Sequence, residues 1–111
     1  MLEPDFQTHP PTILVVEDEK TLRLISKRAL MREGYTVREA SHGEEALGLV
    51  SENLPDLILL DAMMPEMDGF TCCRELQERL GKNCPPILMV TVLDDEESVN
   101  LAFAVGATEY I

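Results

Sequence analysis

Long apolar runs are missing from this sequence of 111 residues. Asp or Pro interrupts the longest ones within a few residues, so none approaches the roughly 20 apolar residues of a membrane-spanning helix. The first eleven residues contain Pro, Glu and Asp but no Lys or Arg, which argues against a signal peptide. We therefore expect a disordered lead-in over residues 1–11, followed by one small domain over residues 12–111 that stays out of the membrane.

Basic residues are also few. Nine Lys and Arg stand against 21 Asp and Glu, which gives a formal net charge of −12. A domain with this charge repels phosphate backbones, so direct binding to nucleic acid is not expected. Most of the acidic residues are expected to form a solvated surface.

Cysteines in metal-binding or paired arrangements are absent from the sequence. Cys72, Cys73 and Cys84 form an odd set without a C-x-x-C motif, and the chain has only two His. We interpret these cysteines as reduced, small apolar residues of a cytoplasmic protein.

Apolar and amphipathic segments alternate along the rest of the chain. Short segments rich in β-branched residues predict buried strands, and apolar residues at helical spacing predict the helices between them. The first helix has Leu22 and Ile25 on its apolar face, and Ser41 followed by Glu44 resembles the capping box of the second. We expect strands over residues 12–16, 35–40, 56–61, 85–91 and 108–111, and helices over 17–34, 43–53, 69–81 and 94–106.

The strict alternation of strand and helix predicts a parallel α/β sheet. Because each strand is apolar along its length, helices are expected on both faces of the sheet. Right-handed crossovers then favour a doubly wound, open sheet. Ligands of such sheets bind outside the carboxyl ends of the strands, where the strand order reverses.

Acidic residues follow two of the predicted strands. Glu17 and Asp18 come directly after the first strand, and Asp61 ends the third, while Thr91 ends the fourth. If the first and third strands are neighbours, three carboxylates share one cleft, and their repulsion favours a bound cation. Mg²⁺ suits such oxygen ligands and often binds phosphate oxygens as well.

Each of these residues also has an ordinary structural interpretation. Asp18 alone would be a helix cap, Asp61 a loop carboxylate and Thr91 a strand-end residue. The methionines of "AMMPEMDG" would fill the core, while Pro65 and the Asp68-Gly69 pair turn the chain out of the sheet. Their joint placement at successive strand ends favours a functional site.

The chain resembles the receiver domains of two-component response regulators. The resemblance is carried by "ILVVEDE" at 13–19, "DLILLDAMMPEMDGF" at 56–70, "PPILMVT" at 85–91 and "AFAVGATEYI" at 102–111. It implies a flavodoxin-like sheet of strand order 2-1-3-4-5. It also implies a signalling role, in which a histidine kinase or phosphotransfer protein donates a phosphoryl group and the chain is not an enzyme that turns over a metabolite.

The resemblance also assigns roles to individual residues. Asp61 is implied as the phosphoryl acceptor. The resemblance implies a Mg²⁺ site at Glu17, Asp18 and Asp61. Of the acidic pair, Asp18 is favoured over Glu17 as the direct ligand. The backbone carbonyl of Met63 is implied as a further ligand. The hydroxyl of Thr91 would contact the phosphate, and Tyr110 would be the aromatic residue that changes rotamer. Phosphorylation would thereby switch the surface formed by the fourth helix and the fifth strand.

The family pattern continues beyond Ile111 to a Lys-Pro pair and a fifth helix. Three explanations are open: a shortened sequence, which we favour; a form completed by a partner or by a second copy in a homodimer; and a receiver that is not phosphorylated. Residues 91–111 also resemble receivers joined to output domains of cyclic-di-GMP synthesis or degradation. No output domain is present in the sequence.

Two other functions compete with a phosphorylated receiver. A pseudo-receiver would act through protein contacts alone, and the missing lysine supports it. A Mg²⁺-dependent phosphatase on a similar sheet would carry two aspartates two residues apart after its first strand, where this chain has Glu17 and Glu19. A phosphatase assay separates this last candidate from the other two.

Overall fold

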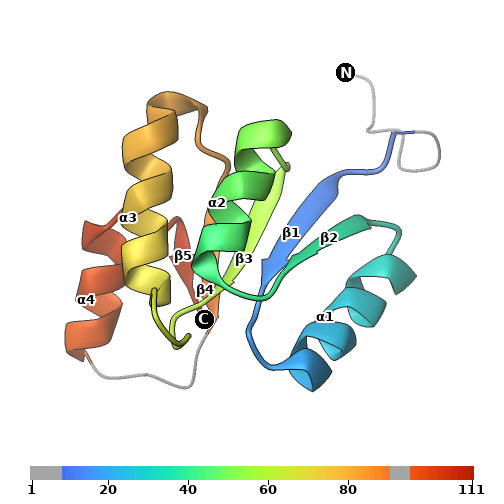
Figure 1. Cartoon of the computed structure of the whole chain (residues 1–111), viewed down its shortest axis with the longest axis horizontal. Coiled ribbons are helices and arrows are strands. Elements are labelled where there is room, and N and C mark those ends of the chain that lie inside the picture. Colours follow the sequence, from blue (N-terminus) through green and yellow to red (C-terminus); the bar gives the residue numbers. More distant parts are fainter. Residues whose placement is uncertain (1–8, 91–95) are drawn as a thin grey trace.

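The computed structural model describes residues 9–90 and 96–111, except for the side chain of Tyr110 (Figure 1). Within these residues, strands and helices alternate as predicted. The strands are β1 (Thr12–Val16), β2 (Thr36–Ala40), β3 (Leu57–Asp61), β4 (Ile87–Val90) and β5 (Glu109–Tyr110). The helices are α1 (Lys20–Arg32), α2 (Gly43–Glu52), α3 (Gly69–Leu80) and α4 (Glu96–Ala104), with a short 3₁₀ turn at Gly81–Asn83.

The strands form one parallel sheet in the order β2-β1-β3-β4-β5, which confirms the flavodoxin-like topology. The order reverses at β1, because the chain first adds β2 on one side and then β3 on the other. Val16 at the end of β1 is in register with Leu60 of β3. The predicted switch point therefore lies between the carboxyl ends of β1 and β3.

Neighbouring residues of β2 show which helix covers which face of the sheet. The Arg38 guanidinium donates to the carbonyls of Leu49 and Asn53 at the end of α2. The Glu39 carboxylate instead pairs with Lys27 of α1. Successive strand residues point to opposite faces, so α1 and α2 lie on opposite sides, and Figure 1 shows α3 and α4 on the side of α2.

The two faces differ in burial. The face under α2 and α3, which we call the closed face, holds the core residues Leu14, Ile58, Leu60, Ile87 and Met89, all 0% exposed. The face that carries α1, which we call the open face, includes Val15, Leu59, Leu88 and Val90. Val15 is buried beside α1, Leu59 and Leu88 are half-buried, and Val90 is 39% exposed.

The expectation of strands buried on both faces is therefore wrong for β3 and β4. Their residues alternate between buried and partly exposed, although nearly all are apolar. The apolar stripe of α1 is exposed too: Leu22 is 51% and Ile25 58% exposed, and each of the 13 described residues of α1 is exposed or half-buried. The apolar pattern was correct, but α1 by itself does not cover the open face.

The start of α2 differs from the predicted capping box by one residue. His42 is the N-cap, and its Nδ1 accepts the amide of Glu45 at 3.2 Å. The Glu45 carboxylate in turn accepts the amide of Ser41. Glu44, the expected partner of Ser41, is exposed in the first turn.

Several sequence-based expectations fall on residues that the structure does not describe. These are residues 1–8 of the predicted lead-in and Thr91, together with the start of the fourth helix expected at residue 94. Among the described helices, none has both the length and the apolar character needed to cross a membrane.

Candidate functional site

The carboxyl ends of β1 and β3 bring three acidic side chains together. Because β1 and β3 are adjacent, the loop after β1 places Glu17 and Asp18 beside Asp61 at the end of β3. One carboxylate oxygen from each residue lies within 4.8 Å of the other two. The predicted convergence of these carboxylates is thus confirmed.

The loop after β1 is held by backbone hydrogen bonds. The amide of Glu17 donates to the carbonyl of Ala40 in β2 at 3.1 Å, and the amide of Glu19 donates to the Glu17 carboxylate at 3.1 Å. Glu19 is the N-cap of α1, and its carboxylate accepts the amides of Thr21 and Leu22. Asp18 is therefore not the helix cap that its position alone suggested, and its exposed carboxylate remains beside Asp61.

The loop after β3 fixes the Asp61 side chain and turns the chain away from the sheet. The Met63 amide donates to Oδ1 of Asp61 at 3.1 Å. The Gly69 amide donates to the Ala62 carbonyl at 2.9 Å, and a Cβ on Gly69 would overlap the carbonyl oxygen of Asp61. Asp68 then caps α3 by accepting the Thr71 amide at 2.8 Å. The Asp-Gly pair thus starts a helix directly against the end of β3, where no larger residue fits.

Two of the three carboxyl groups have raised pKa values. Burial raises the pKa of Glu17 to about 7; the hydrogen bond from the Glu19 amide opposes this shift, and the charge of Asp61 adds to it. Burial also raises the pKa of Asp61, with the nearby charge of Asp18 adding to the effect and the Met63 amide opposing it. The cluster thus concentrates negative charge in a partly buried place, which a bound cation would relieve.

The ligand set fits a hard divalent cation. All three groups offer carboxylate oxygens, and burial, with a smaller contribution from the neighbouring charges, raises the pKa values of Glu17 and Asp61. Mg²⁺ prefers oxygen ligands, and it is usually held by one or two carboxylates with water or phosphate completing its shell. The described residues therefore suit Mg²⁺ at this edge of the sheet.

The structure describes only part of what was predicted for the other site residues. Met63 contacts Asp61 through its amide, and the role of its carbonyl as a metal ligand stays a prediction. Thr91 lies outside the described residues; it follows Val90, which is in register with Asp61. The backbone of Tyr110 pairs with Met89 in β5, and its side chain is outside the described part of the structure.

The methionines of the loop after β3 have three different environments. Met64 is buried in the core, whereas Met63 is 54% exposed and helps line an open, mainly apolar hollow of about 460 Å³ with Met64 and Phe70. Met67 packs against the start of α2, where a Cβ on Gly43 would come within 2.7 Å of its sulfur. Core filling, the ordinary interpretation, thus holds fully for only one of the three.

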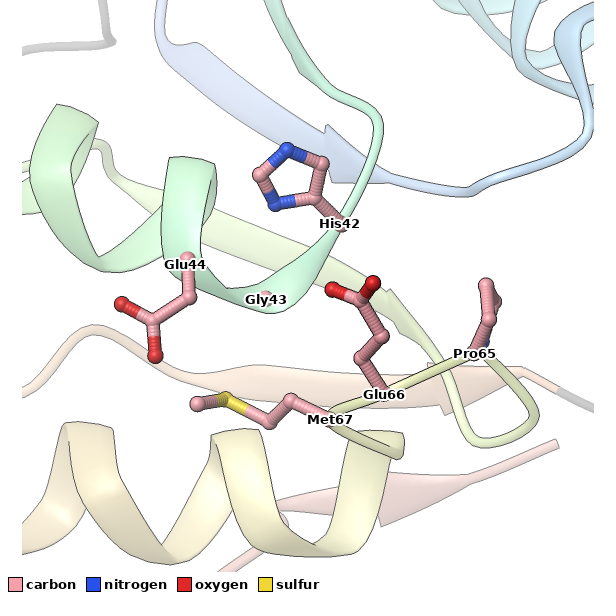
Figure 2. A pocket seen from close by; sticks show the side chains of 6 residues that line it. All are labelled: His42, Gly43, Glu44, Pro65, Glu66 and Met67. Carbon is pink, nitrogen blue, oxygen red and sulfur yellow. The ribbon is translucent and has the colours of Figure 1, made fainter.

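A second hollow lies between the start of α2 and the loop after β3. It measures about 240 Å³, and Figure 2 shows His42, Glu44 and Glu66 around it, with Met67 across from Gly43. The three clustered carboxylates lie outside its lining. This hollow is separate from the acidic cluster.

Sequence reasoning missed one residue that touches the acidic loop. Arg23 of α1 donates from Nη1 to the carbonyl oxygen of Glu17 at 2.8 Å. A basic residue one helical turn after an N-cap was the available signal, but helix surfaces carry many such residues. Only the tertiary structure shows where this side chain ends.

Comparison with known proteins identifies the family. Residues 13–111 match the response regulator receiver domain. The chain belongs to this family. The receiver is 41% identical over 105 residues to the transcriptional regulatory protein ResD of Bacillus subtilis, and 42% identical over 99 residues to PhoP, the alkaline phosphatase synthesis transcriptional regulatory protein of the same organism.

The coverage of these relatives is unequal. The matches span 95% and 89% of the receiver, but only 42% of ResD and 40% of PhoP. Among solved structures, the chemotaxis protein CheY4 of Vibrio cholerae has a TM-score of 0.88 at 31% identity, covering 93% of this chain and 86% of that one. The receiver is therefore the domain of a two-component response regulator, and its relatives are longer proteins.

Proposed function

We propose that this receiver accepts a phosphoryl group on Asp61 in the presence of Mg²⁺. The observation that supports the proposal is the convergence of Glu17, Asp18 and Asp61 at the strand-order reversal. In the reaction, a carboxylate oxygen of Asp61 attacks phosphorus, a new P–O bond forms, and the bond to the donor's leaving group breaks. The donor is a histidine kinase or a phosphotransfer protein.

The residues of the chain orient the acceptor and prepare its charge. The Met63 amide holds one oxygen of Asp61, which fixes the rotamer of the carboxylate before the donor arrives. Bound Mg²⁺ would offset the repulsion between this carboxylate and the incoming phosphoryl group. Glu17 and Asp18 would hold the ion, and because the pKa of Glu17 is raised to about 7, a cation would compete with a proton for this carboxylate near neutral pH.

The proposed output of the reaction is a change of surface. A phosphorylated Asp61 carries more negative charge and new acceptor oxygens at the end of β3. Thr91 would donate its hydroxyl to one of them and Tyr110 would change rotamer, so that the surface around α4 and β5 shifts between two states. The chain accepts the group itself and does not turn over a metabolite.

The downstream partner is proposed from the relatives. ResD and PhoP are named as transcriptional regulatory proteins, and both are more than twice the matched length. An output domain that regulates transcription is therefore favoured over the cyclic-di-GMP-related domain suggested by residues 91–111. The receiver itself, with its net charge of −12, would leave contact with DNA to that domain.

The test is the intact mass of the chain after incubation with acetyl phosphate and Mg²⁺. We expect a phosphoryl adduct on the parent chain and none on Asp61→Asn. Asp68→Asn is the matched control, because this aspartate lies in the same loop and asparagine caps a helix equally well. Adduct on Asp61→Asn would contradict the acceptor assignment. No adduct on any chain would leave two interpretations, a pseudo-receiver that acts through protein contacts or a receiver that needs the lysine and fifth helix of the family pattern. Repeating the test on a chain extended past Ile111 separates them.

A further inference from the structure

Arg23 connects three elements at the acidic edge of the sheet. Its side chain is only 17% exposed, although it belongs to the largely exposed helix α1. Nη1 donates to the carbonyl oxygen of Glu17 at 2.8 Å, and Nε lies 3.5 Å from a carboxylate oxygen of Glu39 in β2. One guanidinium group therefore joins α1 and β2 to the loop that follows β1.

The contact fixes the peptide that leads into Asp18. The Glu17 amide is already held by the carbonyl of Ala40, so Arg23 completes the backbone hydrogen bonds of Glu17. The carbonyl of Glu17 and the amide of Asp18 belong to one planar peptide group. Holding that carbonyl thus sets the direction in which the chain enters Asp18.

The contacts of Arg23 distinguish its hydrogen bond to the Glu17 carbonyl from a simple neutralisation of the Glu39 charge. Glu39 pairs with Lys27 at 3.1 Å as well as with Arg23, so both cations offset the same carboxylate. Partly exposed ion pairs of this kind contribute little by themselves. The charge-assisted bond to the Glu17 carbonyl is the contact that Arg23 makes and Lys27 does not.

We propose that Arg23 is a positioning residue for the metal site: its bond to the Glu17 carbonyl holds Glu17 and Asp18 in the arrangement that binds Mg²⁺. The inference rests on the proposed function and extends it to a residue that touches neither metal nor phosphate. Outer partners that orient metal ligands typically change metal affinity by about 10–100-fold when they are replaced.

The test compares three variants in a Mg²⁺ titration followed by the NMR signals of Asp18 and Asp61. We expect Arg23→Met to weaken Mg²⁺ binding about tenfold, the lower end of that range. Arg23→Lys keeps the charge but lacks the planar fork that places Nη1 on the Glu17 carbonyl and Nε beside Glu39, so we expect a similar loss. Lys27→Met removes one charge from the same helix and the same ion pair, and its affinity should stay within about twofold of the parent, because the carbonyl contact survives.

Two results would overturn the proposal. Parent-like affinity in Arg23→Lys would mean that charge, not the bridge, matters, and equal losses in Arg23→Met and Lys27→Met would point to the same conclusion.

Amide hydrogen exchange of Asp18 and Glu19 without metal gives an independent readout. We expect faster exchange in both Arg23 variants and unchanged exchange in Lys27→Met, with the amides of β4 as a reference for global stability. If the parent chain failed to bind Mg²⁺, the proposed function would fail, and exchange would still decide whether Arg23 holds the loop. Unchanged exchange in both Arg23 variants would refute the positioning role.

Discussion

The two faces of the sheet both consist largely of apolar residues, but these residues are buried on one face and partly exposed on the other. Leu60 on the closed face is 0% exposed, while its neighbour Leu59 on the open face is only half-buried. The same contrast holds for the helices: α2 buries Ala46, Leu47 and Val50, whereas α1 leaves Ile25 58% exposed. The apolar pattern of the sequence indicates which surfaces can be buried. How much of each surface is buried depends on the helices that pack against it.

The largest expected difference between the faces comes from the adjacent leucines of β3. Leu60→Ala should lower the free energy of unfolding by about 3 kcal/mol, because it opens a cavity in a closed core. Leu59→Ala should cost about 1 kcal/mol, since its site is already partly open to solvent. Urea denaturation of both variants measures the two losses in the free energy of unfolding. Equal losses would mean that the open face is covered in solution.

A smaller effect is expected where α3 packs against β3. Gly69→Ala should destabilise the domain by about 2 kcal/mol, because the added Cβ would overlap the Asp61 carbonyl and push α3 away from the closed face. Gly48→Ala is the matched control in α2: an added Cβ there meets no atom within 4 Å among the described residues. It should stabilise the domain by up to about 1 kcal/mol through helix propensity. If both variants behaved alike in denaturation, the close approach at Gly69 would not be real.

Most of the fold was predictable because the sequence repeats one simple pattern. Alternating strand and helix segments, together with right-handed crossovers, leave few topologies, and the order β2-β1-β3-β4-β5 is one of them. Burial was less predictable. The positions of Ile25 and Leu59 look like core positions in sequence, but their exposure depends on how much of the open face α1 covers.

The candidate site was predictable for the residues that end strands. Glu17, Asp18 and Asp61 meet because parallel strands bring their carboxyl ends to one edge. Arg23 was missed because its contact with the Glu17 carbonyl depends on the angle between α1 and the sheet, which no local pattern encodes. The cap of α1 could not be chosen from sequence among three consecutive acidic residues, since the hydrogen bonds to Glu19 depend on where the helix begins.

A pH effect is expected at the acidic edge, next to the open face. Glu17 and Asp61 line a small cavity of about 50 Å³ with Leu59 and Val90. In metal-free protein the pKa of Glu17 rises from 4.5 to about 7, so the folded state binds more protons than the unfolded state between these values. The contribution of Glu17 to stability should therefore be fully present below pH 4.5 and be lost as pH rises towards 7.

The partial exposure of Glu17 limits the size of this pH effect. Because the side chain is partly exposed, solvent screening limits its share to about 1 kcal/mol. Thermal melts with a chelator should show the decline, and Glu17→Gln should flatten it. A slope that persists in Glu17→Gln would assign the titration to another group of the cluster.

The smallest effect is expected on α1. Ile25→Gln should change the free energy of unfolding by less than about 0.5 kcal/mol, because this side chain is largely exposed in the monomer. Leu47→Gln in α2 is the control at 3% exposure, and burying its unpaired amide should cost several times more. Denaturation at two protein concentrations completes the test. A large, concentration-dependent loss in Ile25→Gln would show that a second copy covers α1 and the open face, and a large loss independent of concentration would show that this chain covers them itself.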